Sequence, residues 1–181
     1  MDCCTEKAGA ISSADLAEAM ASDPENAPAP RHDLKHTCAS CGNTGRVVTR
    51  KTVLLMLEPE HFDHVGEKEY RFCADPECPV VYFTEHGDVS FTTDALRVRV
   101  GLKEKIDPIP LCYCFGFYEA DARAEIAATG QSTIPQRITA LIKEKMCACP
   151  ARNPSGACCL GEVNKAVKRL QAEVTSTLQM S

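Results

Sequence analysis

Closely spaced cysteines are the feature that most constrains this chain, since 12 of its 181 residues are cysteine. An even total suits a scaffold of disulfide bonds, but such scaffolds are typical of small secreted domains. The first residues, MDCCTEKAGAISSADLAEAM, contain neither the basic nor the apolar region of a signal peptide. We therefore expect a cytoplasmic protein in which most of the paired thiols bind metal ions.

The remaining composition argues against several classes of partner. Apolar residues make up 44% of the chain, which is enough to bury a core. The formal net charge of -5 disfavours nucleic acid as a partner. No apolar run approaches the length of a membrane span. The composition is compatible with a monomer or a weak dimer.

The sequence changes character twice, which predicts three regions. Residues 1–35 end in a stretch rich in Pro and Ala, DPENAPAPRHD, and are expected to form a flexible arm. Residues 36–108 read as a zinc-ribbon-like β domain, with strands predicted in RVVTRKTVLLML, CPVVYFTEH, DVSFTT and LRVRVG. A short helical turn or loop is expected in EPEHFDHVGEKEYRF. Residues 109–181 read as helical, so the predicted fold class is α+β: a small β-rich module followed by a three-helix domain.

Three helices are predicted in the C-terminal region. The first covers Glu119 to Thr129, and Gly130 is its stop signal. The second begins at Ser132 as the N-cap and extends to about Lys145, with a proline in its first turn. The third carries an apolar stripe at helical spacing, which indicates packing against a core: Val163, Val167, Leu170, Val174 and Leu178.

The β-rich region holds two turns that each carry two thiols, CASCG and CADPECP. Two such turns beside strands are what a tetrahedral Zn²⁺ site requires, so a closed, structural zinc site is predicted. The four intervening residues of the second turn depart from the commonest spacing. The alternative is four buried thiols that pack as small apolar groups. The predicted zinc ligands are Cys38, Cys41, Cys73 and Cys78.

The helical region holds six more thiols on three short segments. The CxC motif has two sulfurs that project to the same side of an extended chain, where they could share one iron. Four cysteines are the usual ligands of a [2Fe–2S] cluster, so at least two of the six must serve another purpose. The six are Cys112, Cys114, Cys147, Cys149, Cys158 and Cys159.

These motifs carry a family resemblance. The segments CYCFGF and CACPARNPSGACCLGEV, with two helices between them, resemble the [2Fe–2S] domain of the bacterioferritin-associated-ferredoxin type. More closely, they resemble the N-terminal region of CopZ-type iron–sulfur copper chaperones. The segments CASCGNTGR and YRFCADPECPVVYF resemble the zinc domain that precedes the cluster domain in those proteins. The resemblance covers residues 36 to 178.

The resemblance implies that Cys112 and Cys114 bind the cluster together with one thiol of each later pair. We favour Cys149 and Cys159, with Cys147 and Cys158 as close alternatives. Cys159 stands where the third helix is predicted to start, and the N–H groups and dipole of a helix start stabilise an anionic cluster.

One departure from the family limits what the resemblance implies. The chain carries no MxCxxC copper loop, so we expect it to lack the C-terminal heavy-metal-associated domain, and the copper delivery step is not carried over. What remains is a one-electron centre that reduces a metal ion or passes electrons to a partner. The implied partner is a redox or metal-transfer protein, such as a copper ATPase or a separate copper chaperone. Cys3 and Cys4 could capture a soft ion such as Cu(I) or Hg(II), or form an incidental exposed dithiol.

Three functions remain open from the sequence. The first is a [2Fe–2S] and zinc protein in copper or other soft-metal handling. The second is a ferredoxin-like electron-transfer protein unrelated to copper. The third is an adaptor in which the later thiols bind a second zinc. No Ser-His-Asp set, phosphate-binding Gly-rich loop or carboxylate pair indicates a hydrolase or a transferase.

Overall fold

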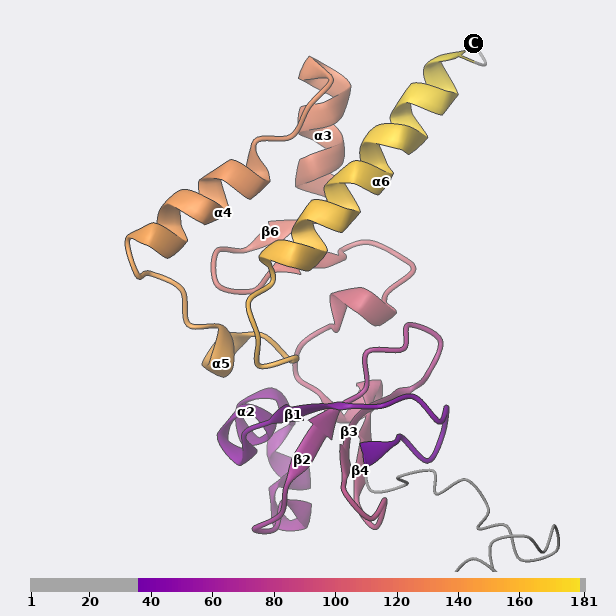
Figure 1. Ribbon diagram of the computed structural model, residues 1–181, viewed down its shortest axis with the longest axis vertical. Helices are drawn as coiled ribbons and strands as arrows, with labels where there is room; N and C mark the ends of the chain where they lie inside the picture. Colours follow the sequence, from indigo (N-terminus) through magenta and orange to yellow (C-terminus); the bar gives the residue numbers. More distant parts are fainter. Residues whose placement is uncertain (1–35, 180–181) are drawn as a thin grey trace, which may run out of the picture. The chain divides into compact units, whose positions relative to one another are not determined.

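The computed structural model describes residues 36–179, which lie within one compact unit that begins at Leu34. The fold is α+β, with a β-rich part followed by a helical part (Figure 1). A four-stranded antiparallel sheet in the order β1-β2-β3-β4 forms the first part. Its strands are β1 (Arg46–Val48), β2 (Tyr70–Phe72), β3 (Val80–Thr84) and β4 (Ser90–Thr92). The predicted N-terminal arm, with Cys3 and Cys4, lies outside the described residues.

The segment after β1 is a helix, where a strand was predicted. Helix α2 (Arg50–Met56) begins after Thr49, whose side-chain oxygen accepts a hydrogen bond from the backbone N–H of Thr52 at 3.1 Å. This N-cap stabilises the first turn, and the Lys, Leu and Met residues that follow have high helix propensity. Three residues of α2 are buried: Thr52, Val53 and Met56. The prediction of a strand through this segment was wrong because the cap and the core contacts outweigh the β-branched residues.

Two other strand boundaries differ from the prediction. Strand β2 lies inside the segment expected to be a helical turn or loop, of which only η3 (Pro59–His64) is helical. The segment LRVRVG forms no strand between η4 (Thr93–Ala95) and η5 (Gly101–Lys103). The backbone N–H of Arg97 instead donates to the carbonyl of Met56 at 2.9 Å, so this segment is bonded to the end of α2 rather than to a neighbouring strand.

The predicted helices are present in the C-terminal part. Their bounds are α3 (Glu119–Thr129), α4 (Ile134–Lys143) and α6 (Leu160–Gln179). Gly130 ends α3 in the left-handed conformation, with φ 79°, as its stop signal predicted. The N-cap of α4 is Thr133, one residue beyond the predicted Ser132. A short β5 (Pro110–Cys112) and β6 (Phe117–Tyr118) hairpin precedes α3, and a short helix, α5 (Cys149–Arg152), lies between α4 and α6.

Helix α6 organises the helical part, because it packs against α3, α4 and β5 (Figure 1). Its stripe residues Val163, Val167 and Leu170 are buried, together with Ile126 of α3 and Ile138 of α4. Full burial of an aliphatic side chain contributes about 1.5–3 kcal/mol, so this apolar seam stabilises the three helices as a unit. No helix in the described range, α6 included, is long and apolar enough to cross a membrane.

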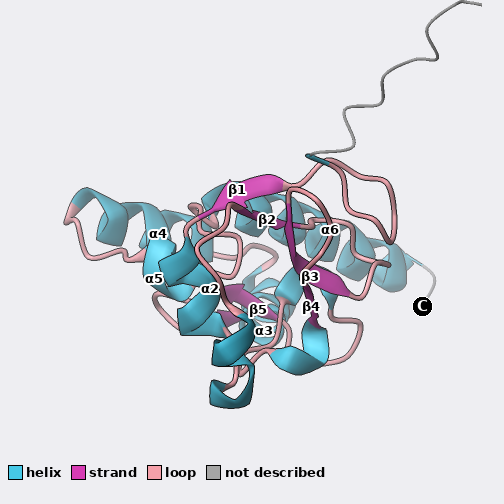
Figure 2. Cartoon of the chain, turned by 90° about the horizontal axis from the view of Figure 1, so that it is seen from below, coloured by secondary structure: helices cyan, strands magenta, loops and turns pink. Residues whose placement is uncertain are grey.

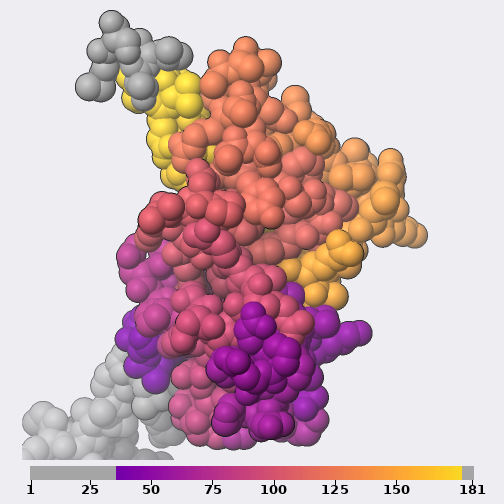
Figure 3. Space-filling view, turned by 180° about the vertical axis from the view of Figure 1, so that it is seen from behind, coloured from indigo at the N-terminus to yellow at the C-terminus, as the bar shows by residue number. Residues whose placement is uncertain are grey.

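Helix α5 and the loop between α5 and α6 are hydrogen-bonded to the β-rich part. The Tyr82 hydroxyl, on β3, donates to the carbonyl of Pro154 at 2.7 Å. The Thr52 hydroxyl, on α2, donates to the carbonyl of Pro150 at 2.8 Å. Helices α2 and α5 lie side by side (Figure 2), and the gold segment near residue 150 contacts the indigo and magenta part in the space-filling view (Figure 3). The β-rich part therefore supports the loop that carries the last cysteines.

We expect Tyr82→Phe to lower the free energy of unfolding by about 1–3 kcal/mol, because it leaves the buried Pro154 carbonyl without its donor. Chemical denaturation of the metal-loaded proteins measures this change. Tyr70→Phe is the matched control, since the Tyr70 hydroxyl makes only a long 3.4 Å bond to the Gly66 carbonyl. Equal losses in the two variants would contradict a specific role for Tyr82.

Candidate metal centres

The first cysteine turn folds because a glycine stands at its end. Gly42 has φ 74°, a left-handed conformation that favours glycine, and its N–H donates to the carbonyl of Cys38 at 2.8 Å. The N–H of Cys38 in turn donates to the carbonyl of Asn43 at 2.9 Å. The turn brings the sulfurs of Cys38 and Cys41 to the same side.

The second cysteine turn follows β2 and is tied to the first. The Asp75 carboxylate accepts hydrogen bonds from the Glu77 backbone N–H at 2.9 Å and from the Asn43 side-chain amide at 2.6 Å. Lys103 Nζ donates to the carbonyls of Asp75 and Cys78, at 2.6 and 2.9 Å. Local hydrogen bonds therefore hold both turns in place.

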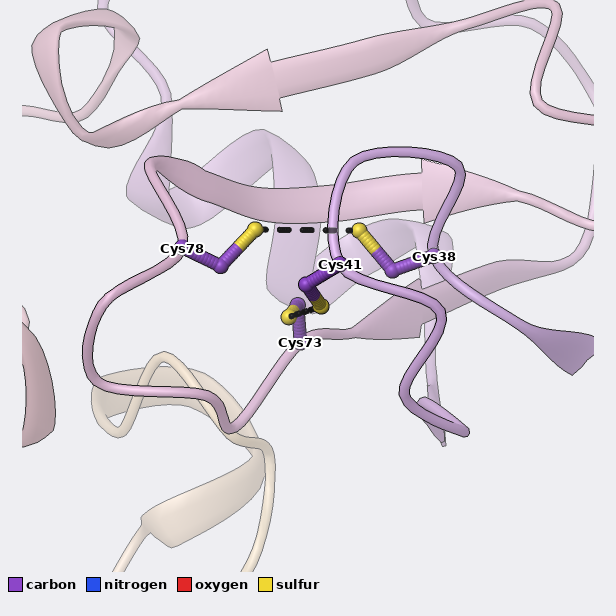
Figure 4. A group of neighbouring side chains, drawn as sticks. All are labelled: Cys38, Cys41, Cys73 and Cys78. Atoms are coloured by element: carbon purple, nitrogen blue, oxygen red, sulfur yellow. Dashed lines mark hydrogen bonds between the residues drawn. The ribbon is translucent and has the colours of Figure 1, made fainter.

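The sulfurs of the predicted zinc ligands meet at one point. All four lie within 4.8 Å of one another, the only set of three or more metal-ligating side chains to do so among residues 36–179. The sulfurs of Cys38 and Cys78 are 3.8 Å apart, and those of Cys41 and Cys73 are 3.6 Å apart (Figure 4). A tetrahedron with Zn–S bonds of about 2.3 Å requires sulfur separations of about 3.8 Å. The four thiols therefore fit a zinc ion.

Burial and hydrogen bonds control the ionisation of these thiols. Burial raises the pKa of Cys38 and of Cys73. Burial also opposes ionisation of Cys78, but hydrogen bonds from the Ser40 side chain and the Val80 backbone outweigh it and lower its pKa to about 7. Cys38 and Cys73 therefore stay protonated unless a cation binds, because thiolates are the metal-binding form and metal binding releases their protons.

The later thiols converge as two pairs. Cys112 ends β5 and Cys114 lies in the hairpin turn, whereas Cys149 begins α5 and Cys159 directly precedes α6. The sulfurs of Cys114 and Cys149 are 3.8 Å apart. Cys112 and Cys159 belong to the same buried cluster of the helical part, and their thiols act on each other's pKa. The two sulfurs of the CxC motif thus have different partners among the later thiols. The sequence analysis had suggested that both could bind one iron.

The two remaining thiols of this group differ in environment. Cys149 and Cys159 are buried, with 6% and 5% of their surface exposed, whereas Cys147 is half-buried and Cys158 is exposed. In the part of the chain that the structure describes, neither Cys147 nor Cys158 hydrogen-bonds to another sulfur. The two buried thiols, Cys149 and Cys159, are the ones that the sequence analysis favoured over Cys147 and Cys158.

Hydrogen bonds and burial also set the charge on these pairs. The hydrogen bond from Cys159 lowers the pKa of Cys112 to about 6, although burial acts in the opposite direction. The same bond, together with burial, raises the pKa of Cys159. Burial and the nearby Cys114 raise the pKa of Cys149 to about 12. The backbone N–H of Ala148 donates to the Cys114 sulfur at 3.3 Å. The pair of Cys112 and Cys159 can thus stabilise one thiolate, on Cys112, and the raised pKa values of Cys149 and Cys159 mean that full ionisation requires cations.

The loop that carries the later cysteines is braced by residues with no signal in the sequence. The buried Asn153 side chain donates to the Ala157 carbonyl at 2.7 Å and accepts from the Ser155 N–H at 3.1 Å. Gly156 has φ 65°, and a Cβ there would lie 3.4 Å from a methyl group of Val48. Sequence reasoning also missed Tyr82, because an aromatic residue in an apolar strand indicates only core packing.

Comparisons with known proteins agree with this architecture. A family model described as a zinc binding domain of CopZ type matches residues 35–97, a range that contains all four converging thiols. The copper chaperone CopZ of Archaeoglobus fulgidus is 30% identical over 147 residues, which cover 76% of this chain and 69% of that protein. The X-ray structure of the N-terminal domain of Archaeoglobus fulgidus CopZ superimposes with a TM-score of 0.61 at 28% identity, over 71% of this chain and 95% of that domain. The chain belongs to the CopZ family.

Proposed function

We propose that this protein handles copper or another soft metal and that it carries one structural zinc ion and one [2Fe–2S] cluster. The observation that carries the proposal is the arrangement of the later thiols. They meet as two pairs, Cys114 with Cys149 and Cys112 with Cys159, and not as a single quartet. Three of the four are buried, and Cys114 is half-buried. Two pairs suit a dinuclear centre with two cysteines for each metal, whereas one zinc ion needs four converging sulfurs.

The proposed zinc domain spans residues 36–108, with Cys38, Cys41, Cys73 and Cys78 as ligands. Its sulfur separations support this assignment. Four thiolates would close the coordination sphere and leave no position for a catalytic water, so the role is structural. The core under the site is small, since it contains only three of the four cysteines, Val80 and Phe83, with Cys41 packed against it. Metal binding would therefore stabilise mainly the two cysteine turns, because the rest of the domain has its own core of buried residues between Val48 and Val100.

The proposed cluster domain spans residues 109–181 and resembles the three-helix [2Fe–2S] domain of bacterioferritin-associated ferredoxins. Its ligands would be Cys112, Cys114, Cys149 and Cys159. When bound, such a cluster supplies one-electron redox chemistry. The chain buries three of these sulfurs, donates the Ala148 N–H to the fourth and holds the ligand loop with Asn153. Burial and hydrogen bonds to sulfur are the means by which a protein tunes the potential of a cluster.

The link to copper rests on the family. The relative from Archaeoglobus fulgidus is named a copper chaperone, and this chain spans 69% of its length. We extend that role to this chain as handling of copper or another soft metal, with a copper ATPase or a separate chaperone as its partner. The second candidate is a ferredoxin-like carrier unrelated to copper, which would use the same one-electron centre.

We expect Cys41→Ser to remove zinc, because serine replaces one of four converging thiolates. Elemental analysis should show a fall from about one zinc per chain to near zero. The loss should lower stability by about 4 kcal/mol at a zinc concentration 1,000-fold above its Kd. Cys147→Ser is the matched control and should keep its zinc. Full zinc retention by the Cys41 variant would contradict the ligand assignment.

We expect Cys149→Ser and Cys159→Ser to lose most of the visible charge-transfer absorption of anaerobically purified protein, since each removes a buried ligand. Cys147→Ser and Cys158→Ser should keep it, because these thiols stand outside both pairs. Visible absorption per chain and iron content measure the outcome. If the unsubstituted protein contains two zinc ions and has no visible bands, the adaptor function is correct and the iron–sulfur proposal is wrong.

Copper separates the two remaining functions. A Cu(I) titration against a competing chelator should show tight binding if the protein handles copper, since soft thiolates select Cu(I). The double variant Cys3→Ser, Cys4→Ser should bind Cu(I) more weakly if these thiols take part. No binding by the unsubstituted protein would favour the ferredoxin-like carrier.

A further inference from the structure

We propose that the cavity beside Cys112 is the docking surface for an acidic one-electron-transfer protein. We call this cavity the arginine pocket. It has a volume of about 560 Å³, and its lining includes Cys112, Arg97, Arg99 and Arg152 together with the apolar rim residues Leu55 and Tyr118. The inference rests on the proposed function, because a cluster bound to Cys112 makes this surface a route for electrons.

The lining of the arginine pocket is strongly asymmetric in charge. It contains three arginines and no Asp or Glu, although the chain as a whole carries a net charge of -5. A cavity lined by one sign of charge focuses the field and raises the association rate of partners of opposite charge. The pocket therefore selects a partner with carboxylates on its docking face.

Two of the three arginines keep their charge available to a partner. Arg97 donates from Nε to the Leu57 carbonyl at 2.7 Å and lies over the Phe62 ring, 5.6 Å from its centroid. Arg152 donates to the Cys114 carbonyl at 3.2 Å. Both side chains are exposed, and in the described part of the chain neither forms an ion pair with a carboxylate.

The third arginine is partly neutralised. Arg99 forms an ion pair with Glu104, and Asp107 also acts on its charge. The excess positive charge of the pocket therefore comes from Arg97 and Arg152. Their backbone contacts hold both guanidinium groups near the hairpin that carries Cys112.

The rim indicates a protein partner. Leu55 is 39% exposed and Tyr118 is 40% exposed, so an aliphatic and an aromatic side chain stand beside the arginines. Aromatic residues and arginine are enriched in protein interfaces, and Tyr and Arg are common among the residues that dominate binding energy. Cys112 is only 1% exposed, so a partner covering this rim would approach the proposed cluster through a single buried ligand.

A second cavity, of about 530 Å³, reaches Cys159 but lacks this asymmetry. Its lining includes three glutamates beside its basic residues, and Glu119 is paired with Arg123 and Arg169. Its charges are therefore largely compensated within the chain. An acidic partner is therefore expected to bind at the arginine pocket beside Cys112 rather than at the cavity beside Cys159.

Small redox probes test the electrostatics of the arginine pocket. Dithionite-reduced protein is mixed in a stopped-flow instrument with the anionic Co(III) complex of EDTA or with cationic hexaamminecobalt(III). Each Co(III) accepts one electron as the cluster is oxidised, and the visible absorbance reports the rate. Arg152→Gln and Leu55→Glu should slow the anionic probe about 3- to 10-fold at low salt, since steering of this kind changes association rates by about 10-fold or more. Both variants should speed the cationic probe.

Two matched variants outside the pocket control for net charge. Arg46→Gln and Val47→Glu make the same charge changes at exposed positions on β1, and neither residue lines the pocket. Their rates should stay within about 2-fold of the unsubstituted protein, because neither charge change lies in the cavity that focuses the field. Equal effects in the control and pocket variants would overturn the inference. Leu55→Glu leaves the Arg152 contact to Cys114 intact, so it separates charge from any disturbance of the ligand turn.

An acidic plant-type [2Fe–2S] ferredoxin then serves as the protein probe. Its rate of electron exchange should fall about 3-fold or more in both pocket variants and should decrease with ionic strength. A response of the anionic cobalt probe without a response of the ferredoxin would identify a small-anion site and overturn protein docking. If the two pocket variants keep their visible bands and their electron-exchange rates are unchanged, the docking surface is wrong and the proposed function is unaffected. Absence of those bands from the unsubstituted protein would instead defeat the proposed function.

Discussion

The structure depends on the convergence of cysteine sulfurs from segments far apart in the sequence. Cys38 and Cys78 are 40 residues apart, and their sulfurs lie 3.8 Å from each other. Cys114 and Cys149 are 35 residues apart at the same separation. Packed thiolates repel one another in a buried site, and burial alone opposes their ionisation. A bound cation would therefore stabilise both groups of thiolates, and we expect metal binding and folding to be coupled.

One continuous segment links the two thiol groups. Lys103 donates to the carbonyls of Asp75 and Cys78 in the second cysteine turn. Two residues earlier, the N–H of Gly101 donates to the hydroxyl of Tyr113 at 2.8 Å, and Tyr113 stands between Cys112 and Cys114. Only glycine fits at position 101, because a Cβ there would lie 2.0 Å from the Pro110 carbonyl oxygen. The second cysteine turn and the CxC turn thus both hydrogen-bond to the short segment Gly101–Lys103. The bond from Tyr82 to Pro154 is a further link, between the β-rich part and the loop before α6.

Much of the helical part could be predicted from local signals. Gly130 marks the end of α3, and the periodic valines and leucine of α6 mark its buried face. The error at α2 has a physical origin, since a segment with Val, Leu and Met is compatible with either structure. The N-cap at Thr49 and the burial of Val53 and Met56 decide for the helix. The segment around Arg97 could not be predicted for a similar reason. The bond from its backbone N–H to the Met56 carbonyl forms only because α2 ends at Met56.

The number of thiols, their division into two groups and the class of ligand that each group suits could all be read from the amino-acid sequence. Spacing alone indicated Cys38, Cys41, Cys73 and Cys78 as one set, since each turn is local and its geometry follows from a few residues. Only the tertiary structure decided which later thiols pair, because the burial of Cys149 and Cys159 and the exposure of Cys158 depend on how α5, α6 and the hairpin pack. The arginine pocket is likewise a tertiary feature. Its three arginines come from segments more than 50 residues apart, and no local pattern brings them to one cavity.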